Sequence, residues 1–155
     1  MDSTYVSAIV EMPLFRGFTE AGAQRLLDLG EVKEHAPGEQ LCAEGDPADR
    51  VLLILTGKLR VYVERAGSDL VLGDFGPGAI LGEIAVLCGI PRATSARAIE
   101  RSVVLCWSEQ AFHTLMFGDA FLSHRILRNS LRFLIDHEKS LIESLVQERV
   151  ADQAI

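Results

Sequence analysis

The spacing of apolar residues divides the chain into three stretches. Residues 1–30 predict two short helices, separated by a break over residues 12–18. The second of them is predicted to begin after Thr19, whose hydroxyl can cap a helix, and to end at Gly30. Residues 31–108 contain short β-rich runs that alternate with glycine turns, and residues 109–155 are helical again. We expect these stretches to form one domain over residues 1–155.

The central stretch contains two kinds of strand pattern. Residues 51–55 are all apolar, as in a strand that is buried on both faces, whereas residues 58–64 alternate apolar and polar side chains. Because only Thr56 and Gly57 separate them, the two runs predict a hairpin. Further strands are predicted near residues 70–72, 93–98 and 103–107. Many short strands with frequent turns indicate a β-sandwich or a jelly roll.

The last stretch predicts one helix over residues 109–117 and another from about residue 119 to the end. In the second helix, leucines recur at alternating three- and four-residue steps, and Glu138 interrupts the series. The series is Leu127, Leu131, Leu134, Leu141 and Leu145. Such a stripe fits either a helix packed on its own domain or a two-helix contact between subunits. We expect the first half to pack on the domain and the second half to form a homodimer contact, with Glu138 as its weak point.

Charge and composition argue against several classes of protein. The 155 residues carry a formal net charge of −7, which gives no basic field for a nucleic-acid backbone. Only 15 residues follow position 140, too few for an attached three-helix DNA reader, so we expect no direct DNA binding. No apolar run is long enough for a membrane helix, and the N-terminus does not read as a secretory signal. We therefore expect a cytoplasmic protein without membrane contact.

The residue pattern does not indicate catalysis. The three cysteines show no paired spacing for a disulfide framework or a zinc site. The four histidines do not form the cluster of metal ligands that an enzyme built on a similar roll, such as a cupin, would need. No Ser-His-Asp or Cys-His arrangement can be singled out either. We expect that the protein is not an enzyme and binds no metal.

Residues 81–95 carry the strongest functional signal. The segment opens with Leu81, Gly82 and Glu83, and Arg92 follows nine residues after Glu83. Both charged residues flank a predicted helix start, where free backbone N–H groups and the positive end of the helix dipole suit a phosphate. The arginine adds a fixed cation, and the carboxylate can accept hydrogen bonds from sugar hydroxyls. The segment therefore predicts a site for a phosphorylated ribose.

The same segment resembles the phosphate-binding cassette of the cyclic-nucleotide-binding domain family, and the resemblance extends over about residues 10–140. It implies an α+β fold in which an eight-stranded β jelly roll lies between N-terminal helices and a C-terminal helix that acts as a lid and dimer contact. It also implies that Glu83 binds the ribose 2′-hydroxyl and that Arg92 binds the exocyclic phosphate oxygens. The other phosphate oxygens are assigned to the backbone N–H groups of Ile84, Ala85 and Ala93.

Three positions bear on which nucleotide binds. In relatives a threonine directly after the cassette arginine tends to accompany cyclic GMP, so Ala93 at this position favours cyclic AMP. Thr94 stands where alanine is usual, which keeps cyclic GMP open. Arg132 on the last helix is a candidate for contact with the base, and the alternative is that it belongs to a solvated basic face.

The sequence thus predicts a cyclic-nucleotide sensor module without an effector domain of its own. We expect it to act on a separate, unidentified downstream protein through movement of the C-terminal helix. The alternative is a protein-interaction module that dimerises without nucleotide and keeps a degenerate pocket.

Overall fold

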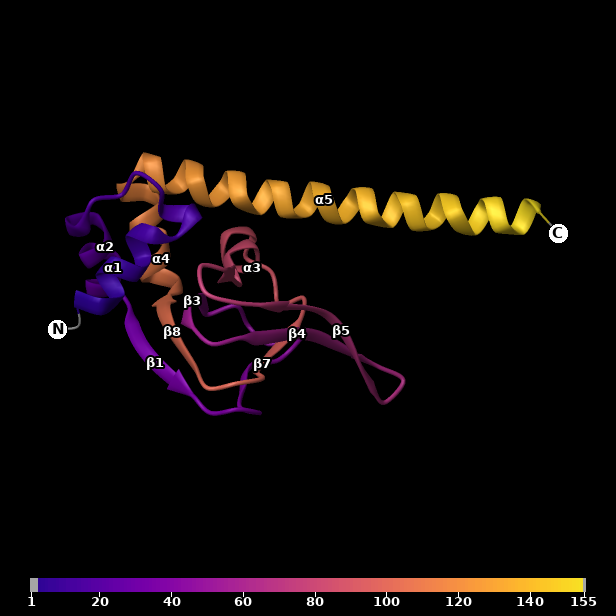
Figure 1. Ribbon diagram of the computed structural model, residues 1–155, viewed down its shortest axis with the longest axis horizontal. Helices are drawn as coiled ribbons and strands as arrows, with labels where there is room; N and C mark the ends of the chain where they lie inside the picture. The colour runs from indigo at the N-terminus through magenta and orange to yellow at the C-terminus, as the bar shows by residue number, and fades with distance from the viewer. Residues whose placement is uncertain (1–2, 155) are drawn as a thin grey trace.

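The computed structural model describes residues 3–154 and shows two stacked sheets with a layer of helices at one end (Figure 1). The helices are α1 (Ser3–Glu11), the 3₁₀ helix η1 (Pro13–Phe15), α2 (Glu20–Asp28), α3 (Glu83–Cys88), α4 (Glu109–Gly118) and α5 (Ala120–Gln153). Within residues 3–154 the strands are β1 (Glu31–His35), β2 (Gln40–Cys42), β3 (Arg50–Thr56), β4 (Leu59–Arg65), β5 (Ser68–Phe75), β6 (Ile80–Leu81), β7 (Ser95–Ala98) and β8 (Ser102–Ser108).

The strands pair antiparallel in a nested order. β1 pairs with β8, β2 with β7, β3 with β6 and β4 with β5. Additional pairing of β3 with β8 and of β4 with β7 completes the two sheets, β1-β8-β3-β6 and β2-β7-β4-β5. In this nested connectivity, typical of a jelly roll, the chain runs out through four strands and back through the next four.

Strand β3 is buried on both faces, as its unbroken apolar run predicts. Val51, Leu53 and Leu55 belong to the cluster under the helices, whereas Leu52 and Ile54 belong to the cluster between the two sheets. Successive side chains of a strand point to opposite faces, so a strand with a packed layer on each side needs apolar residues at every position. This strand therefore joins the two cores of the domain.

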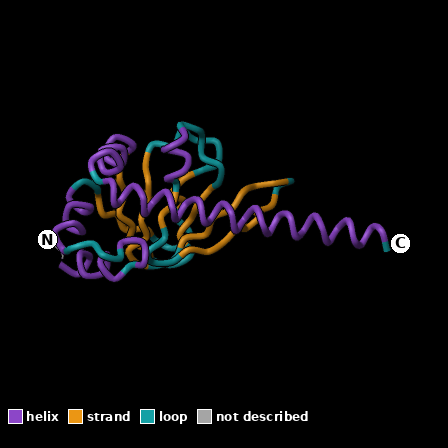
Figure 2. Tube along the Cα trace, turned by 90° about the horizontal axis from the view of Figure 1, so that it is seen from above, coloured by secondary structure: helices purple, strands orange, loops and turns teal. Residues whose placement is uncertain are grey.

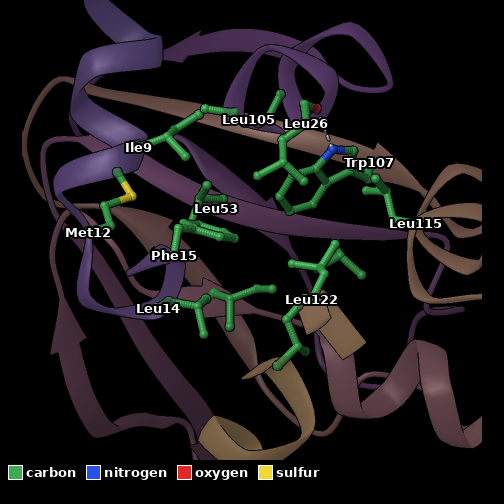
Figure 3. Close-up of a cluster of buried hydrophobic side chains, with 14 of the residues drawn as sticks. Ile9, Met12, Leu14, Phe15, Leu26, Leu53, Leu105, Trp107, Leu115 and Leu122 are labelled. Atoms are coloured by element: carbon green, nitrogen blue, oxygen red, sulfur yellow. Dashed lines mark hydrogen bonds between the residues drawn. The ribbon is translucent and has the colours of Figure 1, made fainter. Parts of the chain in front are cut away.

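Helices from both ends of the chain cover the outer face of the sheet that contains β3 and β8 (Figure 3). Phe15 from the N-terminal segment and Phe112 from α4 are fully buried in this layer. The indole N–H of Trp107 on β8 donates a hydrogen bond of 2.8 Å to the carbonyl of Leu26 on α2. The N-terminal and C-terminal helices thus form one layer with a shared core.

The predicted hairpin over residues 51–64 is wrong, because β3 and β4 belong to different sheets. The chain turns from one sheet to the other at Gly57, which has φ of +90°. A Cβ at Gly57 would lie 2.2 Å from Ser102 Oγ, so a larger residue would not fit at this corner. An apolar run that is buried on both faces specifies a strand but not its partner. β4 pairs instead with β5 across a turn at Ala66 and Gly67.

The start of α2 follows the predicted cap at Thr19, and α5 has a cap at Asp119 that was not predicted. The hydroxyl of Thr19 accepts a hydrogen bond of 3.1 Å from the Gly22 N–H at the start of α2. The carboxylate of Asp119 accepts one of 3.0 Å from the Leu122 N–H at the start of α5. α2 ends at Asp28, close to the predicted stop at Gly30.

Helix α5 has two unlike halves (Figures 1 and 2). Its buried residues are Leu122, Ile126 and Ser130, which recur at four-residue steps and face the domain. Every described residue from 131 onward is exposed. The first half therefore packs on the domain, but not through the predicted leucines, since Leu127, Leu131 and Leu134 are 45%, 58% and 47% exposed. The ring of Phe133 still contacts that of Phe75 on β5, with 6.2 Å between the ring centroids, and the rest of the helix projects past the domain. No helix within the described part of the chain is both long and apolar enough to cross a membrane.

Candidate functional site

The cassette is built where β6 meets α3. Gly82 adopts φ of +85° and is the N-cap residue of α3, so Glu83 is the first residue of the helix, as predicted. The first N–H groups of an α-helix have no acceptor inside the helix. The N–H groups of Ile84 and Ala85 are therefore at the end of α3 that favours an anion.

The side chain of Arg92 is 6% exposed and lies against Gly82. Its Nη2 donates a hydrogen bond of 2.8 Å to the carbonyl of Arg50 and lies 3.5 Å from Asp49 Oδ1. A Cβ on Gly82 would lie 2.3 Å from Arg92 Nη1, so a larger residue would displace the guanidinium, and the φ of +85° at this position itself favours glycine. The guanidinium is thus held directly beside the residue that precedes Glu83.

The loop between β2 and β3 fixes the backbone around Arg92. The Arg92 N–H donates to the Asp46 carbonyl at 2.9 Å, and the Gly45 N–H donates to the Arg92 carbonyl at 2.8 Å. The hydroxyl of Ser95 accepts a hydrogen bond of 2.9 Å from the backbone N–H of Glu44 in the same loop. These bonds fix the backbone of the cassette arginine against this loop.

The carboxyl of Glu83 is buried, with 7% of the residue exposed. Burial raises its pKa, and hydrogen bonds from its own backbone N–H and from Ser130 partly oppose the shift. The hydroxyl of Ser130 on α5 donates to Glu83 Oε1 at 2.9 Å. The acceptor assigned to a ribose hydroxyl is therefore bonded to a hydroxyl of the chain itself.

The other predicted cassette residues differ in their exposure to solvent. Leu81 at the end of β6 and Ile84 in α3 are half-buried, and Ala85 is buried. Ala93 is exposed and Thr94 is half-buried, and both lie in the bend before β7. The predicted strand over residues 93–98 therefore begins later, at Ser95.

Arg132, the predicted base contact, is exposed on α5. It lies two residues beyond Ser130, and no hydrogen bond or ion pair within residues 3–154 joins it to the cassette. Its role stays a prediction.

Ser130 is the site residue that sequence reasoning missed. It lies 47 positions after Glu83, and nothing local in the sequence connects the two. Its spacing does carry a signal, since it continues the four-residue steps of Leu122 and Ile126. A serine in a buried apolar stripe needs a hydrogen-bond partner.

Fold and site together define a class of protein: a β-roll domain that buries one carboxylate and one guanidinium beside a helix start, an arrangement suited to an anionic sugar phosphate. The chain belongs to the cyclic nucleotide-binding domain family, whose pattern matches residues 32–119, more than half of its length.

Individual relatives agree with this membership. The chain is 28% identical over 117 residues to a cAMP-dependent protein kinase regulatory subunit of Mycosarcoma maydis. The aligned region covers 72% of this chain and 22% of that protein. A cyclic nucleotide-binding domain from Methylobacillus flagellatus superposes with a TM-score of 0.72 at 28% identity, over 88% of this chain and 79% of the other.

The catabolite activator protein of Thermus thermophilus shares the fold, with a TM-score of 0.76 at 24% identity. That superposition covers 83% of this chain and 61% of the activator. The chain thus spans only part of the kinase subunit and of the activator.

Proposed function

We propose that this chain is a regulatory module that binds a cyclic nucleotide, with cyclic AMP preferred over cyclic GMP. Glu83 binds the ribose 2′-hydroxyl, and Arg92 binds the exocyclic phosphate. The backbone N–H groups of Ile84, Ala85 and Ala93 bind the remaining phosphate oxygens, and Arg132 contacts the base. The module has a regulatory rather than a catalytic role, and it works in the cytoplasm.

The observation that carries this proposal is the burial of both charged residues in one cassette. Burying a charge costs free energy unless it is paired and hydrogen-bonded, and a structural element could use apolar residues here instead. Arg92 has five N–H donors, so its bond to the Arg50 carbonyl leaves others for a phosphate. Gly82, the residue before Glu83, leaves room for the guanidinium, and a side chain at this position would displace it.

The preference for cyclic AMP rests on Ala93 and on the relatives. Ala93 offers no hydroxyl beside the phosphate, unlike the threonine that tends to accompany cyclic GMP. The regulatory subunit that this chain resembles is named as part of a cAMP-dependent protein kinase. The proposed output is a change in the position of α5, which a separate downstream protein detects.

A second candidate function is pairing through α5 without any nucleotide. The observation in its favour is the row of exposed apolar side chains on the projecting half. These are Leu131, Leu134, Ile135, Leu141, Ile142, Leu145, Val146 and Val150. Large apolar patches on a surface mark interaction sites. A second copy of the chain is the proposed partner, because the leucine steps fit a two-helix seam.

Calorimetric titration with cyclic AMP and cyclic GMP tests the first proposal. Truncating one side of a buried charge-assisted contact costs about 2–5 kcal/mol, so Arg92→Ala should weaken binding about 30-fold or more. The matched control is Arg149→Ala, which removes an exposed arginine from the far end of α5 and should leave the affinity unchanged.

Two results would contradict the proposal: a wild-type protein that binds neither nucleotide, or an Arg92→Ala variant with wild-type affinity. Small-angle scattering with and without cyclic AMP addresses the second function. A dimer that persists in both conditions supports nucleotide-independent pairing. A change in size on addition of cyclic AMP would instead indicate that the nucleotide controls pairing.

A further inference from the structure

The two ends of α5 carry opposite charge. Residues 120–135, the basic end, contain three arginines and no acidic residue. Residues 136–153, the acidic end, contain five acidic residues against one lysine and one arginine. A helix on its own favours the reverse order, because its dipole attracts acidic side chains at the start and basic ones at the end. Within residues 3–154, no ion pair joins a side chain of α5 to another residue, so these charges are open to a neighbour outside the domain.

The basic end also exposes apolar side chains. Two phenylalanines lie where α4 meets α5: Phe117 is 88% exposed and Phe121 is 50% exposed. The guanidinium of Arg125 lies over the Phe121 ring, with 5.2 Å between Cζ and the ring centroid. Aromatic residues and arginine are enriched in the cores of protein interfaces. The exposed leucines of α5 thus continue, at its basic end, into a surface with the composition of an interface.

The order of charges decides how two copies can pair through α5. In a parallel pair each residue faces its own counterpart, so the two basic ends would lie side by side and Glu138 would face Glu138 of the partner subunit. In an antiparallel pair the basic end of each helix lies along the acidic end of the other, and the helix dipoles also attract. Neighbouring helix axes are about 8–10 Å apart, about one Debye length, so salt screens these charges only in part.

One antiparallel register also matches leucine with leucine. If the two helices cross near residue 136, Leu127 faces the partner's Leu145. In the same register Leu131 faces the partner's Leu141. The tip of the partner's helix then reaches the level of Phe121 and covers this ring, which a parallel pair would leave uncovered.

On the basis of the second candidate function above, we propose that two copies of the chain pair antiparallel through α5, with the basic end of each helix against the acidic end of the other. Both copies use the same surface, so the contact closes as a dimer and does not propagate. The two domains lie at opposite ends of the helix pair.

Analytical ultracentrifugation of charge-reversed full-length chains tests the orientation. Arg128→Glu with Arg132→Glu reverses the charge of the basic end, and Glu148→Lys with Asp152→Lys reverses that of the acidic tip. Each double variant should weaken the dimer about tenfold, in line with the loss of several exposed ion pairs. A chain with all four changes exchanges the charges of the two ends and should regain wild-type affinity to within about threefold.

The design controls for overall charge and for folding. The two double variants change the net charge in opposite directions, so a loss of affinity in both cannot come from net charge. All four positions are exposed in the domain. Double variants that associate like wild type would overturn the antiparallel orientation and leave pairing itself intact, because in a parallel pair each end faces its own copy before and after the reversal.

Small-angle scattering of the wild-type dimer gives a reading without mutation. In the antiparallel register the two copies of Ile126 lie about 30 Å apart along the helix pair, so the scattering should show two separated domains. Two domains side by side at one end of the helix pair would overturn the proposal. A chain that stays monomeric at every concentration would show that the second candidate function itself is wrong.

Discussion

The two halves of α5 have similar apolar content but opposite surroundings. The first half buries Leu122 and Ile126 against the domain, whereas the second half leaves Leu141 and Leu145 more than half exposed. The helix is continuous through both halves, from Ala120 to Gln153. Hydrophobic periodicity therefore predicts a helix in both halves. Whether its apolar side chains are buried or exposed depends on whether another element packs against them.

The largest expected effect is on stability, and it comes from making the same Ile→Ala substitution in each half of α5. Ile126 is 1% exposed and Ile142 is 52% exposed. Ile126→Ala should lower the free energy of unfolding by about 2–5 kcal/mol, because it leaves a cavity in the core. Ile142→Ala should change it by less than about 0.5 kcal/mol, as expected for an exposed site. Urea denaturation at low protein concentration measures both.

Concentration is the control for this comparison. If Ile142→Ala is as costly as Ile126→Ala even in dilute protein, the second half of α5 is packed within a single chain and the distinction fails. A cost that appears only at high concentration indicates that a second copy covers Ile142.

A smaller effect is expected at Glu138, in the predicted seam of the projecting half. Replacing a charge in an apolar two-helix contact removes a desolvation cost, so Glu138→Leu should tighten self-association by about tenfold. Glu143→Leu makes the same change outside the leucine steps and is the control. Analytical ultracentrifugation over a range of concentrations measures the dissociation constants. Equal tightening by both variants would show that the leucine steps do not define the contact.

The smallest expected effect concerns Glu83, the acceptor beneath the anchored half. Burial raises the pKa of its carboxyl above the unfolded value. Folding therefore favours the protonated form, and the group contributes stability at low pH that is lost as pH rises through the unfolded and then the folded pKa. Glu83→Gln should accordingly raise the melting temperature of the ligand-free protein at neutral pH by a few degrees, on the order expected for about 1 kcal/mol.

This gain should vanish below about pH 4, where the wild-type carboxyl is also protonated. Glu148→Gln, at an exposed position of α5, serves as the control and should show no such pH-dependent gain. A melting temperature of Glu83→Gln below that of wild type at neutral pH would show that the hydrogen bonds to the carboxylate outweigh its burial.

The sequence predicted the parts of this fold that depend on local physics. Thr19 predicts the start of α2, and the apolar run of residues 51–55 predicts β3. Both signals are local, because capping and periodicity act within a few residues. The pairing of β3 was not predictable in this way, since its partners β6 and β8 are distant in the chain. The two residues of β6 are too few to show a period.

The candidate site likewise contains residues that the sequence could predict and one that it could not. Glu83 and Arg92 stand within one short segment, so their relation could be seen from spacing. Ser130 reaches Glu83 only after the roll and α5 have folded against each other. Contacts of this kind follow from tertiary packing rather than from local pattern.

The projecting half of α5 also makes the helix a lever. Ser130 and Gln153 are 23 residues apart, which corresponds to an arm of about 35 Å at 1.5 Å per residue. A tilt of about 10° at the serine would then carry the tip by about 6 Å. A small change of angle where the helix meets the domain would thus become a displacement of several ångströms at its far end.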